Sequence, residues 1–296
     1  MLRDHPLLTP LLVVYAAILV LGGIFEFGPP LALVNLILLA GYVSVIHFAT
    51  RGRQLAIPTA DPPHHRSRDI GLAITVAVLQ LAAVSVVWFV ILPRLYFPVS
   101  SGYLRAAGLP ALVAAKAANA ALTVPLLLLP TLVAIAGFRM NLRDVGLTAS
   151  PRDLALGVVL AGIAVGLGVG AVAAGNRPGL LWQSATLPIV AATITLQSLV
   201  NGIPEELAFR GVIFGRLMPW LGRPGNSLAI STMAFGLYNV PSLVAGSHVQ
   251  LWEAVPITLF GALPGLAFGY LYYRTRSIWP GAIWHTSVTG IGVMFA

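Results

Sequence analysis

The sequence predicts an all-α fold: a polytopic membrane bundle of about eight to nine transmembrane helices with the N-terminus inside. Apolar residues make up 58% of the 296 residues and charged residues only 9%, whereas a soluble protein has about 25% charged residues. Apolar runs of about 20 residues, the length with which a helix crosses a bilayer, recur along the whole chain. The lipid bilayer is therefore the first partner that the sequence predicts, and buried charge is what needs an explanation.

Nine segments are candidate membrane spans, and no soluble domain is apparent between them. They cover residues 8–26, 29–49, 70–93, 109–137, 154–175, 188–203, 226–246, 252–273 and 277–295. The sixth is short and continues past Pro204 into another apolar helix over 204–218. Because the residue before a proline disfavours helical dihedral angles, we expect a kink or a new helix start at Ile203. We divide the chain into N-terminal helices with a basic loop, residues 1–150, and a helical core, residues 151–296.

The arginines predict the orientation of the helices. With the N-terminus inside, thirteen arginines lie in inner segments and three in outer ones, and inner loops carry the excess of positive charge in membrane proteins. Loops 50–69 and 138–153 are then cytoplasmic and Ala296 is outside. The net charge of +8 forms no contiguous basic block, so no nucleic-acid partner is predicted. We expect a multi-pass protein of the cell (inner) membrane, and 16 arginines against one lysine indicate a bacterial source.

Two adjacent carboxylates, Glu205 and Glu206, stand out in the stretch NGIPEELAFRG because the chain has only nine acidic residues. Arg210 follows Glu206 by four residues, so the two lie on one helix face and are placed to pair. Glu205 is rotated by about 100° from Glu206. We therefore expect Glu206 to contact Arg210, and Glu205 to point into a polar cavity shared with His285. The alternative interpretation is that both acids are interfacial charges that meet water and nearby arginines.

Two later spans also carry polar side chains at helical spacing. The stretch AFGLYNVPS places Phe235 and Asn239 on one face, and IWHTSVTG does the same for His285 and Thr289. A histidine inside an apolar span is costly unless it is paired or lines a polar cavity. A hydrogen bond between helices would also explain His285, and contact between helices would explain Asn239.

Taken in this order, the three segments resemble the motifs of the CPBP family of intramembrane endopeptidases. That family comprises the CAAX prenyl proteases of the Ras-converting-enzyme type and the bacteriocin-processing proteins, with EExxxR, FxxxH and HxxxN on successive helices. Glu205, Glu206 and Arg210 fit the first motif. Asn239 stands where the family has histidine, and Thr289 where it usually has asparagine. The resemblance covers roughly residues 185–296.

The resemblance implies a glutamic-type endopeptidase that cleaves a peptide or membrane-protein substrate near the cytoplasmic face of the membrane. Glu205 would activate the attacking water, while His285 and Thr289 would line the oxyanion side. Asn239 would replace a histidine that helps to hold the water, and asparagine cannot take up a proton near neutral pH. A catalytically impaired relative, acting as a membrane scaffold, immunity or binding protein, is therefore an alternative. A transporter that uses the acids for proton coupling is another, although no inverted repeat is apparent.

No cofactor is expected, and the chain contains no cysteine, which excludes disulfides and thiolate metal sites. Zinc is the alternative. Because Asn239 stands in place of a histidine, the ligands of a zinc ion would be Glu205, Glu206 and His285. This set has fewer histidines than the usual catalytic zinc site. The sequence does not indicate whether the protein is a monomer or an oligomer.

Overall fold

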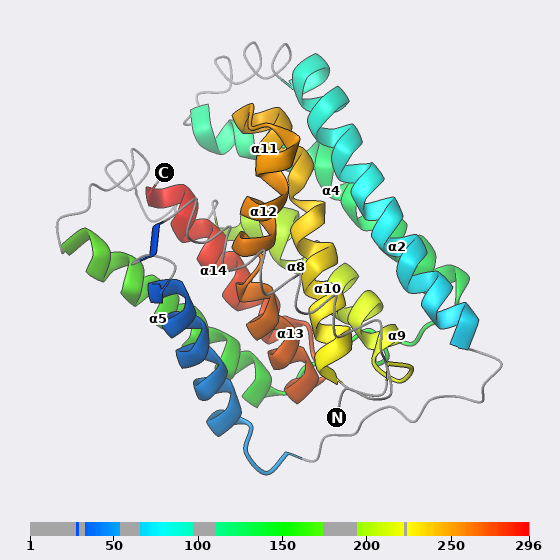
Figure 1. Ribbon diagram of the computed structural model, residues 1–296, viewed down its shortest axis with the longest axis vertical. Coiled ribbons are helices and arrows are strands. Elements are labelled where there is room, and N and C mark those ends of the chain that lie inside the picture. Colours follow the sequence, from blue (N-terminus) through cyan, green and yellow to red (C-terminus); the bar gives the residue numbers. More distant parts are fainter. Residues whose placement is uncertain are drawn as a thin grey trace.

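The computed structural model of the protein describes residues 28–29, 33–53, 66–96, 111–173, 194–221 and 224–295. This part of the chain is helical and contains no strand (Figure 1), which confirms the all-α fold. The predicted first span, 8–26, lies outside the described residues, as does most of the basic loop 50–69.

Every predicted span that falls within the described residues is helical. A first helix covers Leu33–Ala49. The others, with π-helices marked η, are α2 (Arg66–Val86), η2 (Val87–Tyr96), α4 (Ala111–Gly137), α5 (Pro151–Ala173), η3 (Ser198–Gly202), α8 (Ile203–Glu205), η4 (Glu206–Phe214), α9 (Gly215–Leu217), α10 (Pro224–Tyr238), α11 (Val240–Ser247), α12 (Leu251–Gly261), α13 (Pro264–Thr275) and α14 (Trp279–Phe295).

Length and composition support three or four membrane spans in the described part of the chain. The segments Ser67–Arg94, Pro151–Gly170 and Pro224–Ser247 are long and apolar enough to cross a bilayer. A fourth arises if α12 and α13, which are bent by 41° relative to each other, count as one broken span. The protein is thus a helical membrane protein, while the count of eight to nine spans and the inside position of the N-terminus stay predictions.

The helix that carries Glu205 and Glu206 does not break at Pro204. Ile203 is helical, with φ −74° and ψ −50°, and its N–H donates to the carbonyl of Ser198, five residues back. This wide π turn brings the helix to Pro204, whose missing N–H then falls where the hydrogen-bond register changes. The predicted new helix start at Ile203 is therefore wrong, because η3, α8, η4 and α9 form one continuous helix with the two acids in its middle. A kink at this point stays a prediction.

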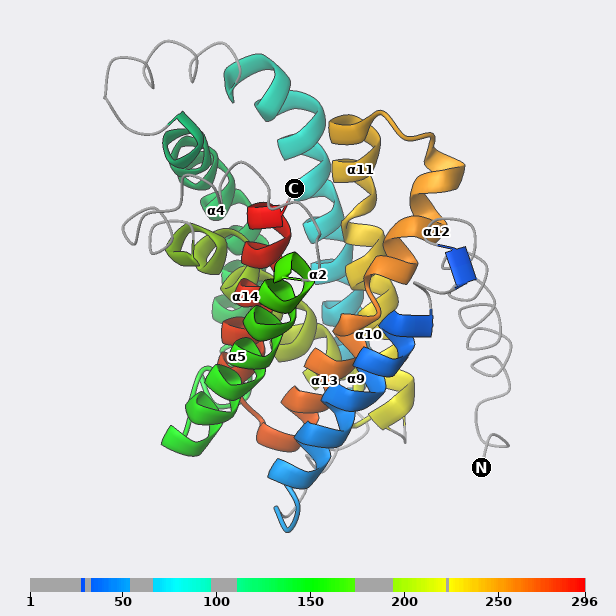
Figure 2. The ribbon, with the colours of Figure 1, turned by 90° about the vertical axis from the view of Figure 1, so that its left-hand side faces the viewer.

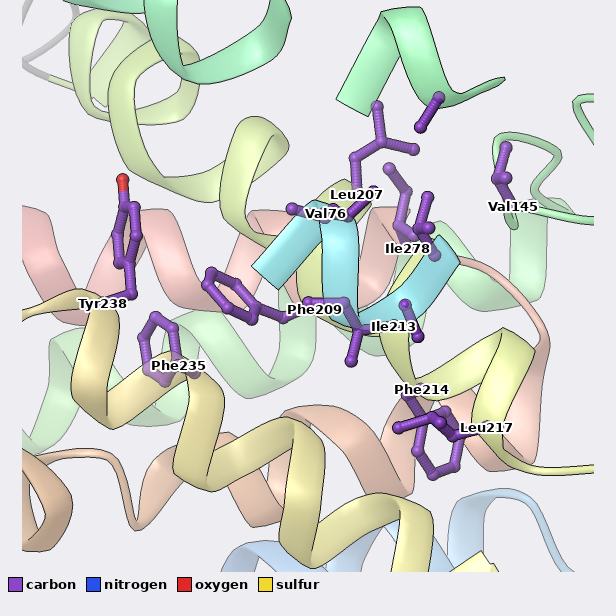
Figure 3. Close-up of a cluster of buried hydrophobic side chains, with 14 of the residues drawn as sticks. Val76, Val145, Leu207, Phe209, Ile213, Phe214, Leu217, Phe235, Tyr238 and Ile278 are labelled. Atoms are coloured by element: carbon purple, nitrogen blue, oxygen red, sulfur yellow. The ribbon is translucent and has the colours of Figure 1, made fainter. Parts of the chain in front are cut away.

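This continuous helix lies at the centre of the bundle and is buried on all sides from Pro204 to Phe214. Its η4 segment packs against α2, α4, α10 and α13, and its η3 segment packs against α14. Figure 3 shows the surrounding core, in which Phe209 and Leu207 of η4 lie near Val76 of α2 and Phe235 of α10. A second core, around Trp284, joins α5, α13, α14 and the helix over Leu33–Ala49. Figure 2 shows the ribbons of these helices. Helices from both predicted domains share these cores, and the boundary at residue 150 stays a prediction.

The outer helices expose apolar side chains. Ile74 of α2, Val133 of α4 and Val158 of α5 are each more than half exposed. The acids and Arg210 lie inside. This arrangement, apolar outside and charged inside, is the one expected of helices that contact lipid and surround a functional interior.

Arginine-bearing segments that are far apart in the sequence meet at one end of the bundle, the lower end in Figure 1. Arg53 pairs with Asp153 at the start of α5, and Arg216 of α9 pairs with Asp69 at the start of α2. Arg274, at the end of α13, donates to the hydroxyl of Thr50 over 2.8 Å. Their meeting agrees with the predicted grouping of arginines on one side, and which side of the membrane this is stays a prediction.

Candidate active site

Four buried ionisable side chains meet between the continuous helix and α14. His285 lies between the two acids: its Nδ1 is 3.1 Å from Oε1 of Glu206, and its Nε2 is 3.5 Å from Oε2 of Glu205. Nη1 of Arg210 is also 3.1 Å from Oε1 of Glu206. All four residues are at most 4% exposed. The expected contact of Glu206 with Arg210 is present, and Glu205 and His285 line one cavity, as expected. The alternative of two interfacial charges does not fit this burial.

The charges of this cluster balance in two ways. Burial of an unbalanced charge is costly, so the four groups are expected to be neutral together. With two carboxylates, Arg210 and a protonated His285, the sum is zero. It is again zero if His285 gives one proton to Glu205. Both arrangements of the protons keep the buried cluster neutral.

Two aromatic rings hold the imidazole of His285 in place. Phe268 of α13 stacks on it at 4.7 Å between centroids, and Phe235 of α10 meets it edge to face at 5.7 Å. The same two rings face the guanidinium of Arg210, at 4.7 Å for Phe235 and 5.4 Å for Phe268. Phe235 belongs to the second motif, whereas nothing in the sequence had pointed to Phe268.

Glycines let the helices approach this cluster closely. A Cβ atom at Gly281 of α14 would lie 2.9 Å from Oε2 of Glu206, and one at Gly265 of α13 would lie 2.8 Å from Nη2 of Arg210. The Gly265 carbonyl accepts a hydrogen bond from that same Nη2 at 3.3 Å. At Gly202, a Cβ atom would lie 2.9 Å from the carbonyl oxygen of Ala282. Gly281 and Gly265 therefore leave room for the charged groups, and Gly202 lets the continuous helix approach α14 closely.

A cavity of about 320 Å³ opens in front of the cluster. Four of the six predicted site residues line it, namely Glu205, Asn239, His285 and Thr289. Glu206 and Arg210 do not reach it and lie behind His285. The predicted residues thus divide into four that can meet a ligand and two that hold those four.

A second cavity, of about 350 Å³, is also lined by Glu205. It shares Asn201, Glu205, Asn239 and Ser242 with the first cavity. Its remaining lining is mostly apolar and includes Trp88 of η2. The carboxylate of Glu205 therefore lies where the two cavities meet.

The two residues that depart from the family motifs are partly engaged by their own helices. Nδ2 of Asn239 donates to the carbonyl of Phe235 at 2.9 Å. The Thr289 hydroxyl donates to the carbonyl of His285 at 3.0 Å. Since a hydroxyl has one proton, Thr289 presents acceptor lone pairs to the cavity in this conformation. On the oxyanion side of the site, a hydrogen bond from Thr289 to the substrate would require the hydroxyl to rotate.

Asn201 is a site residue that the sequence reading missed. Its Nδ2 donates to Oε1 of Glu205 at 3.0 Å, and it lines both cavities. The signal was present in the sequence: Asn201 precedes Glu205 by four residues, the same spacing that predicted the pair of Glu206 and Arg210.

Within the described residues, no three His, Asp or Glu side chains are arranged to hold a metal ion. Both ring nitrogens of His285 already face carboxylates, and Glu206 faces Arg210 as well. The three candidate zinc ligands thus contact one another and do not converge on an empty point. Catalysis without a cofactor stays a prediction.

Comparison with known families finds a match that covers residues 186–291. These residues match the family described as type II CAAX prenyl endopeptidase Rce1-like. The match confirms the resemblance seen in the motifs, and all six predicted site residues lie inside it. No curated protein and no solved structure matches the chain.

Proposed function

Because residues 186–291 form an Rce1-like domain, we propose that the protein is an intramembrane endopeptidase with Glu205 as its general base. The observation that carries this proposal is the position of Glu205. It is a buried carboxylate where two cavities meet, in contact with Asn201 and His285. Burial of an ionisable side chain inside a membrane protein costs free energy, and such side chains mark functional sites.

The reaction is hydrolysis of a peptide bond. A water molecule in the cavity gives a proton to Glu205 while its oxygen bonds to the substrate carbonyl carbon, and the carbonyl electron pair moves onto oxygen. The protonated His285 stabilises the resulting oxyanion from Nε2. The carbon–nitrogen bond then breaks, and the leaving amine takes the proton from Glu205. The products are a carboxylic acid and an amine, and Glu205 is again ionised; the acid then gives its proton to the amine or to water and becomes a carboxylate.

Glu206 and Arg210 orient His285. Glu206 accepts from Nδ1 of His285, so Nε2 is the nitrogen left to face Glu205 and the cavity. Arg210 balances the charge of Glu206. A carboxylate behind a histidine fixes the ring and its tautomer in many enzymes.

The amides hold the water. Asn201 fixes one oxygen of Glu205, which leaves Oε2 on the side of His285. Asn239 lines the same cavity and keeps its carbonyl oxygen and one N–H hydrogen for a ligand. The Asn239 side chain can position the water but cannot take up a proton from it. We therefore expect slow peptide cleavage.

The substrate is a peptide or membrane-protein segment that extends across the two cavities. The apolar lining of the second cavity, which includes Trp88, Leu92 and Leu127, suits an apolar substrate side chain. The family's description refers to CAAX prenyl substrates. A prenylated C-terminal peptide is therefore the first substrate to test beside unmodified peptides.

To test this proposal, the full-length protein in nanodiscs is incubated with these peptides in water labelled with oxygen-18. Mass spectrometry should find cleaved products in which the new carboxylate carries one solvent oxygen. If no peptide is cleaved, the proposed activity is contradicted, and the non-catalytic binding or scaffold alternative becomes the better one.

A further inference from the structure

A polar pocket of about 190 Å³ lies away from Glu205, at the end of the bundle where the arginine-bearing segments meet. Three arginines line it: Arg68 of α2, Arg139 of the loop after α4, and Arg216 of α9. Asp69 and Asp144 also line it. Three positive and two negative side chains leave a net charge of +1.

The two aspartates are already engaged. Oδ1 of Asp69 is 3.6 Å from Nη1 of Arg216, and its Oδ2 accepts a hydrogen bond from the Trp220 ring at 2.9 Å. Oδ2 of Asp144 accepts from the backbone N–H of Asn141 at 3.1 Å. These contacts occupy both carboxylates and one of the three guanidinium groups.

The other two arginines have no carboxylate partner among the residues that the structure describes. Arg68 lies over the ring of Phe138, with Cζ 5.0 Å from the ring centroid. Arg139 has φ 51°, a left-handed backbone conformation that is costly for a residue with a side chain. The turn is held by hydrogen bonds such as that from the Met140 N–H to the Ile135 carbonyl, at 2.9 Å. Two guanidinium groups, with their donors available, thus line one pocket.

The pocket lies at the boundary of a membrane span. The apolar segment Ser67–Arg94 is a candidate span, and Arg68 and Asp69 are in its first turn. Trp220, bonded to Asp69, is of the residue type that favours this boundary. Lipid phosphates lie at the same level, and a guanidinium group binds phosphate through two parallel hydrogen bonds. We propose that this pocket binds the phosphate of an anionic phospholipid.

The test uses full-length protein stripped of lipid in detergent and titrated with phosphatidylglycerol, with bound lipid counted by native mass spectrometry. One molecule of phosphatidylglycerol should bind per protein. It should bind more tightly than phosphatidylcholine, because the positive choline group would lie near the arginines. Arg139→Gln should weaken binding of phosphatidylglycerol roughly tenfold, the size expected for lost hydrogen bonds to a charged group. Arg143→Gln is the matched control: Arg143 is exposed in the same loop, does not line the pocket, and should leave binding unchanged.

Three results would overturn the proposal. Equal losses in Arg139→Gln and Arg143→Gln would show a diffuse charge effect. Equal binding of phosphatidylcholine would show that the pocket does not select an anionic lipid. Displacement of phosphatidylglycerol by millimolar inorganic phosphate would assign the pocket to a soluble anion. Arg68→Gln repeats the test at the second of the two arginines if Arg139→Gln does not fold.

Discussion

Glu205 and Glu206 are chain neighbours with different surroundings. Glu206 is enclosed by Arg210, His285 and Gly281, whereas Glu205 faces two cavities. The i, i+4 spacing to Arg210 was enough to predict this division. The sequence could not predict that His285 would touch both acids, because that depends on how α14 packs against the continuous helix.

Glu206→Gln should destabilise the fold, because Arg210 and His285 would keep their places beside an uncharged amide. Removing one partner of a buried ion pair costs about 3–5 kcal/mol. Unfolding in detergent, followed by tryptophan fluorescence, measures the loss. The double variant Glu206→Leu with Arg210→Met should recover much of it, since no unpaired charge is then buried. The single variants Glu206→Leu and Arg210→Met are the references. A double variant that loses as much stability as these two single variants together would contradict the assigned pairing.

Asn239→His restores the histidine of the family motif. Because a histidine there can exchange a proton with the water, cleavage should stay level or rise, with general acid–base groups worth about 10²–10⁴-fold. The rate of peptide cleavage in nanodiscs is the measurement. Asn141→His, the same change in an exposed loop outside the cavity, should alter nothing. A loss of cleavage in Asn239→His alone would show that the amide itself is required.

At the scale of helices, Gly281 allows α14 to pack closely against the continuous helix. In Gly281→Ala the new methyl group would lie 2.9 Å from Glu206 Oε2 and push α14 away from the acids. We expect a loss of stability of about 1–3 kcal/mol, as for other overpacked sites, together with slower cleavage. Gly290→Ala in the same helix meets nothing within 4 Å. It should be neutral or stabilising by up to about 1 kcal/mol. Equal stabilities of the two variants in the same unfolding assay would contradict the close packing.

Most elements were predictable from apolar periodicity and length, because a helix in lipid satisfies its own backbone. The continuous helix was not. The rule for residues before proline predicted a break at Ile203, but a π turn accommodates Pro204 without one. Such a turn depends on the neighbours that bury the segment, and local sequence does not report them. The bend between α12 and α13 was missed for the same reason.

At the scale of the whole molecule, the arginine pattern predicts that loops 50–69 and 138–153 share one side of the membrane and that Ala296 lies on the other. The chain has no cysteine, so single cysteines can be placed on a clean background. Ser67→Cys and Ala149→Cys should react together with an impermeant maleimide from the cytoplasmic side, and Ala296→Cys from the outside. Reaction of all three from one side would contradict the predicted number of spans.

The meeting of arginine-bearing segments was foreseen as a shared side of the membrane, but their individual partners were not. The pairs of Arg53 with Asp153 and of Arg216 with Asp69 join residues far apart in the sequence. Charge counting gives the side on which a loop lies, whereas the partner depends on how the helices are arranged around the centre.

The most direct test of the central claim is the cleavage rate of Glu205→Gln beside that of Glu253→Gln. Glutamine keeps the shape of the side chain but cannot accept the proton of the water. Glu253, in the first turn of α12, lines neither cavity. With both variants folded in nanodiscs, Glu205→Gln should be inactive and Glu253→Gln should cleave like the wild type. Full activity in Glu205→Gln would contradict the assignment of Glu205 as the base.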